Sequence, residues 1–266
     1  MRKMIWLLIG LVLILILTSF YGYWRFNHTV EKEKEAFLNS QGKKEMKITI
    51  KDLDHLPHLM QEYLKKVGVL GKCRDCHIVF KQIGRIRSKP NQRWTHFNAT
   101  QYMTAEPAGF LWSAQAFPIF IRDKSIEGKG EVKVSFMGLK NLAISSDPET
   151  DQSALARCLG EYLFYPVGFL NKEISWEVMD ARQLKAKMTY KNTAVEGVFQ
   201  FDDDGLLERF RTQRYREKTL TDFTGLAEEY KLIQGYYVPT RMRAIWNLPE
   251  GDFEYFNCTI SDYRIE

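Results

Sequence analysis

Alternation of apolar and polar residues runs through most of this chain and limits it to a fold built largely of β-strands. Val132, Val134 and Phe136 alternate with charged or polar neighbours, and the same period of two returns in residues 184–190 and 195–201. Successive side chains of a strand point to opposite faces, so such a strand has one apolar and one polar face. Half-buried antiparallel sheets show this pattern. We therefore expect a meander of antiparallel strands across the last two thirds of the chain.

Two segments break this period and space their apolar residues as a helix does. The first is Leu56–Val67. The second follows Ser146-Asp147-Pro148, where a capping side chain precedes a proline in the first turn, and it ends near Pro166. Strands with few helices predict a mainly β fold of the α+β type. We expect a curved antiparallel sheet or open half-barrel, with helices on its concave side and one transmembrane helix before it.

The evidence for that transmembrane helix is residues 5–24, which carry no charge and are dominated by leucine and isoleucine. About 20 apolar residues are what a helix needs to cross the hydrocarbon core of a bilayer. A cleavable signal peptide that begins with Arg2 and Lys3 is the alternative. However, Thr18–Trp24 contains no small-x-small cleavage site, and its aromatic residues suit the interfacial belt of a membrane helix. We therefore predict an uncleaved anchor over residues 1–25.

The charges near the anchor favour one orientation and one division of the chain. Because Arg2 and Lys3 precede the apolar segment, the positive-inside rule favours a cytoplasmic N-terminus and an extracytoplasmic C-terminal domain. Residues 26–44, with charges of alternating sign, are interpreted as a solvated stalk, and residues 45–266 as a single β-rich domain. The protein is thus expected to cross the cell membrane once, through residues 5–24.

The net charge argues against one class of partner. The formal net charge is +5, but Arg2, Lys3 and Arg25 lie at the ends of the anchor, so the rest of the chain is close to neutral. A nucleic-acid-binding surface needs a concentrated basic face. We expect a membrane partner and no nucleic-acid partner, and the sequence identifies no protein partner.

Residues 73–77, Cys-Arg-Asp-Cys-His, form the sharpest local motif. In this spacing two thiols can attach a haem while the histidine ligates its iron. Since His77 also begins a predicted strand, we favour a Cys73–Cys76 disulfide or a pair of free thiols, in an oxidising compartment. We expect no resident metal or cofactor, and haem held by Cys73, Cys76 and His77 is the alternative.

No catalytic signature is present. The chain has no nucleophile elbow, phosphate loop or dinucleotide fingerprint, and Asp202–Gly205 lacks the ligand spacing of a calcium loop. Zinc would need His55 or His58 to converge with the 73–77 motif. Asp123 and Glu161 could form a carboxylate pair, but salt-bridged or solvated carboxylates are the simpler interpretation. We therefore expect a protein that is not an enzyme.

The densest aromatic stretch, Arg93–Trp112, is interpreted as two strands joined by a turn at residues 105–109. Large side chains alternate with alanines on one face, which leaves room for a packed helix or for an apolar ligand. Core packing is the favoured interpretation, and Gln101 and Arg122 would orient a ligand if a pocket exists. The candidate pocket residues are Trp94, Phe97, Gln101, Tyr102, Phe110, Trp112 and Arg122.

Several segments resemble those of a known family. They are Leu56-Pro57, Gln82–Arg85, Trp94–Tyr102, Pro107–Trp112, Gly128–Gly130, Phe201–Gly205 and Gly235–Pro239. Together they look like an uncharacterised bacterial domain of unknown function that often follows a membrane segment, and the resemblance covers nearly everything after residue 50. The closing strands are also similar to lipoprotein carriers of the LolA/LolB type. That similarity implies an open half-barrel whose concave face holds acyl chains, although fold alone does not establish function.

These observations lead to three functional hypotheses. The first is a membrane-anchored extracytoplasmic binding module that holds a lipid or another apolar ligand in a β half-barrel. The second is a cell-envelope interaction or structural domain with a filled core. The third, least favoured, is a haem or redox protein that uses Cys73, Cys76 and His77.

Overall fold

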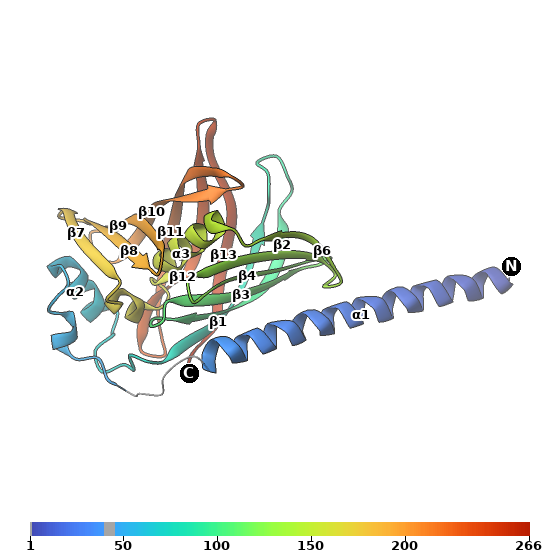
Figure 1. Ribbon diagram of the computed structural model, residues 1–266, viewed down its shortest axis with the longest axis horizontal. Coiled ribbons are helices and arrows are strands. Elements are labelled where there is room, and N and C mark those ends of the chain that lie inside the picture. Colours follow the sequence, from blue (N-terminus) through green and yellow to red (C-terminus); the bar gives the residue numbers. More distant parts are fainter. Residues whose placement is uncertain (1, 40–45) are drawn as a thin grey trace.

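The computed structural model describes residues 2–39 and 46–266, and a single large sheet dominates it (Figure 1). Its 13 strands follow the order β6-β5-β4-β3-β2-β1-β13-β12-β11-β10-β9-β8-β7, and neighbouring strands are antiparallel. The expected curved antiparallel half-barrel is confirmed. The strands are β1 (His77–Ile86), β2 (Thr95–Thr104), β3 (Gly109–Ala116), β4 (Ile119–Ile126), β5 (Lys129–Phe136), β6 (Lys140–Ser145), β7 (Ile174–Asp180), β8 (Gln183–Tyr190), β9 (Thr193–Phe201), β10 (Leu207–Arg216), β11 (Thr219–Ile233), β12 (Tyr236–Leu248) and β13 (Gly251–Ile265).

The helices and short 3₁₀ turns either precede β1 or lie between β6 and β7. They are α1 (Arg2–Asn39), η1 (Ile50–Leu53), α2 (His58–Lys66), α3 (Pro148–Glu161) and η2 (Pro166–Leu170). Strands β1 to β6 run outward to one edge of the sheet, and β7 to β13 return from the other edge until β13 pairs with β1. The chain must therefore cross the whole sheet between β6 and β7, and α3 makes this crossing over the concave face.

Helix α3 begins where the sequence predicts it. The side chain of Asp147 accepts a hydrogen bond from the backbone N–H of Thr150 at 2.9 Å, and Pro148 is the first helical residue. The helix packs mainly against β5 on one wing of the sheet and against β9 and β10 on the other. It closes the half-barrel because it bridges two wings that are far apart in strand order.

Aromatic residues after α3 fill one part of the concave face. Tyr162, Tyr165 and Phe169 are wholly buried, and Phe169 meets Phe199 edge-on with ring centroids 5.2 Å apart. The Tyr165 hydroxyl donates to the carbonyl oxygen of Cys76 at 2.5 Å, so even these deep polar groups are paired. Helix α2 lies beside this filled region (Figure 1).

Helix α1 is longer than the predicted anchor, and its second half packs on the convex face of the sheet. Phe26, Val30 and Phe37 are buried there against Leu111 and Phe120. We expected a solvated stalk in this region from its alternating charges. The apolar residues that face the sheet recur at helical spacing between those charges, and this pattern is the signal that the charge-based interpretation missed.

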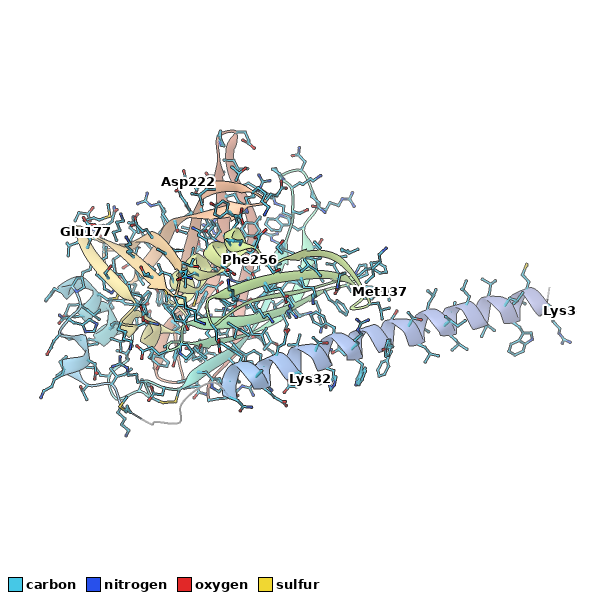
Figure 2. The ribbon with its side chains drawn as sticks, in the orientation of Figure 1. Lys3, Lys32, Met137, Glu177, Asp222 and Phe256 are labelled. Atoms are coloured by element: carbon cyan, nitrogen blue, oxygen red, sulfur yellow. A yellow bond between two sulfur atoms is a disulfide. The ribbon has the colours of Figure 1, made fainter. Side chains whose placement is uncertain are left out.

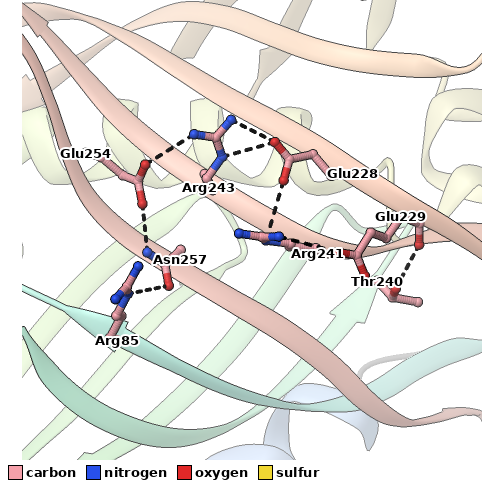
Figure 3. Close-up of polar contacts among 8 residues, drawn as sticks. All are labelled: Arg85, Glu228, Glu229, Thr240, Arg241, Arg243, Glu254 and Asn257. Carbon is pink, nitrogen blue, oxygen red and sulfur yellow. Dashed lines mark hydrogen bonds and ion pairs between the residues drawn. The ribbon is translucent and has the colours of Figure 1, made fainter.

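The convex face of β1, β11, β12 and β13 carries a ladder of opposite charges (Figure 3). Arg243 pairs with Glu228 at 2.7 Å and with Glu254 at 3.3 Å. Glu254 in turn accepts a hydrogen bond from Asn257, which also accepts one from Arg85. Opposite charges on neighbouring strands stabilise their pairing modestly and keep this face in water.

Candidate functional site

A pocket of ≈ 280 Å³ remains between α3 and the concave face of the sheet. Its walls come from α3 and from strands on both sides of it, β3 to β5 and β10 to β13, and they are mostly apolar. Ligand pockets in proteins commonly span about 300–1,000 Å³, so this one lies just below that range and suits a small ligand or a single acyl chain. Residues that form its apolar walls include Ile121, Val134, Phe210, Phe223, Met242 and Phe256.

One side of the pocket is formed by a buried ion cluster on α3. The Arg157 guanidinium donates to Asp123 at 2.6 Å, to Glu161 at 2.9 Å and to Gln101 at 3.2 Å. Its cationic centre also lies 4.6 Å from the ring centroid of Phe110. Burial acts to lower the pKa of Arg157, but the charges of Glu161 and Asp123 outweigh burial and raise it. The two carboxylates are therefore ion-paired to one permanent cation, as the simpler interpretation of the sequence expected.

One carboxylate oxygen of this cluster has no hydrogen-bond partner among the described residues. It is Asp123 Oδ1, which is buried, while Asp123 Oδ2 is held by Arg157. Asp123 also lines the pocket. A buried polar atom without a partner is uncommon in folded proteins, so this oxygen is available to a hydrogen-bond donor inside the pocket.

Arg214, on β10, is the second cation that lines the pocket. Its Nε donates to the backbone carbonyl of Ser153 at 3.2 Å, and its guanidinium lies 4.8 Å from the ring centroid of Phe223. Among residues 2–39 and 46–266 no carboxylate forms an ion pair with it. Unlike Arg157, the partly buried Arg214 thus lies beside an apolar cavity without a carboxylate partner among the described residues.

A larger hollow of ≈ 960 Å³ lies on the opposite, convex side of β8 to β11. Charged side chains of both signs line it, for example Lys187, Glu196 and Arg211. Lys185 and Glu196 are already paired across it. Because polar and charged groups form about as much of its lining as apolar ones, whereas the concave pocket has mostly apolar walls, we take the smaller concave pocket as the candidate site.

Residues 46–258 match a family described as "Family of unknown function (DUF6544)". The chain belongs to this family. The predicted membership of an uncharacterised family is therefore confirmed, and the membership assigns no activity. No curated protein matches the chain.

Among solved structures, the chain is similar to the LolA superfamily protein NE2245 from Nitrosomonas europaea. The two share 12% sequence identity over 78% of this chain and 93% of that chain, with a TM-score of 0.46. A likeness of this size has no bearing on function. The half-barrel of this DUF6544 member is established by its own strand order.

Four of the predicted pocket residues lie on the concave face. Trp112 lines the pocket, and its indole N–H donates to Gln82 at 2.7 Å. Phe97 is packed beneath it, edge-on, with ring centroids 5.8 Å apart. Gln101 and Phe110 belong to the surroundings of Arg157. These four residues therefore support or border the cavity.

The other three predicted residues lie elsewhere. Trp94 precedes β2 and stacks under Arg87, 4.4 Å from its guanidinium. Tyr102 and Arg122 are on the convex face, beneath α1, where Arg122 pairs with Glu33 at 2.6 Å and also with Glu131. The prediction that Arg122 orients a pocket ligand is therefore wrong, since Arg122 holds α1 against the sheet. Its neighbour Asp123 faces inward instead, because a shift of one residue changes the face.

Many of the wall residues were missed because they come from the last four strands. The register pairs Ile86 of β1 with Phe256 of β13, which brings the end of the chain next to its first strand. Phe223, Met242 and Ala244 then follow on β11 and β12. The alternation predicts that these residues face a core, but only the strand order shows that they share it with Trp112.

The motif at 73–77 forms a disulfide. Cys73 and Cys76 are bonded to each other, with their Cα atoms 5.6 Å apart. The described residues contain no group of three or more His, Cys, Asp or Glu side chains that could hold a metal ion. The other two cysteines, Cys158 and Cys258, are free and buried, and burial raises the pKa of the Cys158 thiol to about 12. A thiol with so high a pKa is a poor nucleophile at neutral pH.

His77 should make the fold sensitive to mild acid. Burial lowers its pKa below the ordinary value of 6.5, and Glu266, 3.6 Å away, only partly opposes this. As the pH falls through about 6.5, the unfolded chain takes up a proton that the folded chain resists, so the free energy of unfolding should fall. Chemical denaturation between about pH 7.5 and 5.5 should show a smaller fall for His77→Gln than for the wild type.

His58 supplies the matched control, because its side chain is 87% exposed. His58→Gln should keep the pH dependence of the wild type. If His77→Gln also kept it, another group would be responsible for the acid sensitivity.

Proposed function

We propose that this DUF6544 protein is a membrane-anchored, extracytoplasmic binding module that holds one acyl chain in the pocket between α3 and the sheet. The observation that carries the proposal is a cavity with apolar walls beside a cation, Arg214, that has no carboxylate partner among the described residues. Apolar walls with few polar groups favour an acyl tail, and the cation favours an acidic head group. Asp123 Oδ1 would accept a hydrogen bond from a hydroxyl of the same ligand.

The geometry of α1 supports the anchor. The helix is long and apolar enough to cross a membrane, and its apolar window is 0% buried. The same helix continues without a break into the segment that packs on the convex face. Loss of a signal peptide at the end of the apolar run would cut through this helix, so an uncleaved anchor accounts better for its continuity. The Cys73–Cys76 disulfide suits an oxidising, extracytoplasmic side.

A binding titration tests the ligand and its head group together. The full chain, held in amphipol, is titrated with cis-parinaric acid, whose emission rises in an apolar site. A saturable rise is expected, and palmitic acid should displace the probe at least about tenfold better than hexadecanol, because a charge-assisted hydrogen bond to Arg214 contributes about 1.5–3 kcal/mol. Arg214→Gln should remove the preference for the acid.

Arg243→Gln is the control for that variant, since Arg243 lies on the convex face and far from the pocket lining. It should leave the preference for palmitic acid unchanged. Equal displacement by acid and alcohol in the wild type would rule out the acidic head group. A probe signal that never saturates would argue against the pocket as a binding site.

The second candidate function is protein interaction through β6, one of the two edge strands of the sheet. Strand β6 pairs on one side only, and its Leu142 and Ile144 are 53% and 51% exposed. An unpaired apolar edge can accept a strand from another chain. Ile144→Lys should abolish such pairing in a crosslinking assay while it leaves probe binding intact, so the two functions can be separated.

A further inference from the structure

The place where α1 leaves the body of the protein is fixed by a close backbone contact. A Cβ atom at Gly22 would lie 2.0 Å from the carbonyl oxygen of Met137, so only glycine allows helix and turn to meet this closely. Arg25 adds a hydrogen bond to the carbonyl oxygen of Leu139 at 3.4 Å. The turn between β5 and β6 is thus held against α1 at the end of its apolar segment, and Figure 2 shows Met137 beside the helix.

This contact determines the height of the turn relative to a membrane. Residues 5–24 would occupy the bilayer, so Gly22 lies near its surface. Tyr21 and Trp24 are 54% and 52% exposed on the same turn of the helix, where membrane helices carry interfacial aromatics. The β5–β6 turn must then lie at the level of the lipid head groups.

The neighbouring β3–β4 turn adds an exposed aromatic residue at this level. The backbone N–H of Met137 donates to the carbonyl oxygen of Pro118 at 2.7 Å, so the two turns are adjacent. Phe117 is 71% exposed and Phe136 is 43% exposed, although both are large apolar side chains. Apolar area of this kind is stabilised when it leaves water for the bilayer interface.

We propose that the β3–β4 and β5–β6 turns form a second membrane contact beside α1, with Phe117 inserted at the lipid head-group level. The partner of these turns is the bilayer, because the bilayer surrounds the apolar part of α1 and the same helix contacts the β5–β6 turn directly. Two contacts fix the tilt of the half-barrel relative to the membrane plane, whereas anchoring by the helix alone would leave this tilt variable. This inference rests on the membrane anchor proposed above but not on the ligand.

Labelled cysteines in the full chain, reconstituted in lipid nanodiscs, test the contact. The native cysteines do not interfere, because Cys73 and Cys76 form a disulfide and Cys158 and Cys258 are buried. An environment-sensitive fluorophore is attached at Phe117→Cys, and spin-labelled lipids serve as quenchers. A blue-shifted emission and several-fold stronger quenching than at Leu232→Cys are expected.

Leu232 is the matched control, since it is 73% exposed and lies at the β11–β12 end of the sheet. Leu11→Cys, within the apolar segment, reports on the anchor itself. Quenching at Leu11→Cys with equal, weak quenching at Phe117→Cys and Leu232→Cys would overturn the second contact and leave the anchor standing. Without quenching at Leu11→Cys, the anchor fails and the inference fails with it.

Discussion

Arg157→Met should lower the free energy of unfolding by about 3–5 kcal/mol, because it leaves two buried carboxylates without their cation. The Asp123 and Glu161 side chains are 14% and 6% exposed, and both depend on this guanidinium. Methionine retains the length and apolar stem of arginine, so the loss reports on charge more than on packing. Chemical denaturation followed by tryptophan fluorescence measures the effect.

The convex face offers a matched control for that experiment. Arg243 also bridges two carboxylates, Glu228 and Glu254, but its side chain is 33% exposed (Figure 3). Arg243→Met should cost less than about 1 kcal/mol, since water screens this pair and solvates the carboxylates left behind. Equal effects at the two arginines would contradict the view that the α3 cluster is buried.

A compensated variant separates ion pairing from packing. In Arg157→Met combined with Asp123→Asn and Glu161→Gln, all three groups are neutral. Replacement of a whole buried ion cluster by neutral groups is often close to neutral for stability. This triple variant should therefore recover most of the stability that Arg157→Met loses. If it does not, packing of the guanidinium on Phe110 and Trp112 is the larger contribution.

The second large effect is expected for Gly225→Leu, which should strongly weaken probe binding without unfolding the protein. Gly225 lies on β11 and lines the pocket. A Cβ atom there would meet nothing closer than Phe223 at 3.9 Å and the carbonyl oxygen of Phe210 at 4.0 Å, so the backbone tolerates a side chain. A leucine would then fill space that the acyl chain needs. We expect a loss of affinity of at least about tenfold, or about 1.4 kcal/mol.

The free energy of unfolding of Gly225→Leu should rise or stay unchanged. Glycine weakens a strand interior because it loses more backbone entropy on folding and has no side chain to pack. Thr224→Val, at the next position and on the opposite face of β11, is the control and should keep wild-type binding. If Gly225→Leu binds the probe like the wild type, the ligand does not occupy this pocket.

Much of the architecture follows from local patterns in the sequence. The alternation predicted most strands, and Asp147-Pro148 predicted the start of α3. Strand β6 and the first half of β11 carry weaker local signals, because Lys140–Ser145 is short and Thr219–Glu228 alternates weakly. Their position depends on partner strands that are distant in the chain.

The candidate site was predictable only in part, for a related reason. The alternation in β2 and β3 is consistent with Phe97 and Trp112 on the core side of the sheet. Which face is concave depends on the register with β13, a contact between the two ends of the domain. Arg122 was therefore assigned to the pocket and Arg214 was missed, because nothing local distinguishes an arginine under α1 from one beside the cavity.

Photo-crosslinking in native membranes can show whether an acyl chain occupies the pocket between α3 and the sheet. Cells that express the full chain are supplied with a fatty acid carrying a diazirine, irradiated, and the modified peptides are mapped by mass spectrometry. We expect crosslinks on α3 and on β11 to β13, at residues such as Phe223 and Met242, and their loss in Gly225→Leu. Crosslinks confined to residues 5–24, with the same pattern in Gly225→Leu, would contradict the proposed binding site.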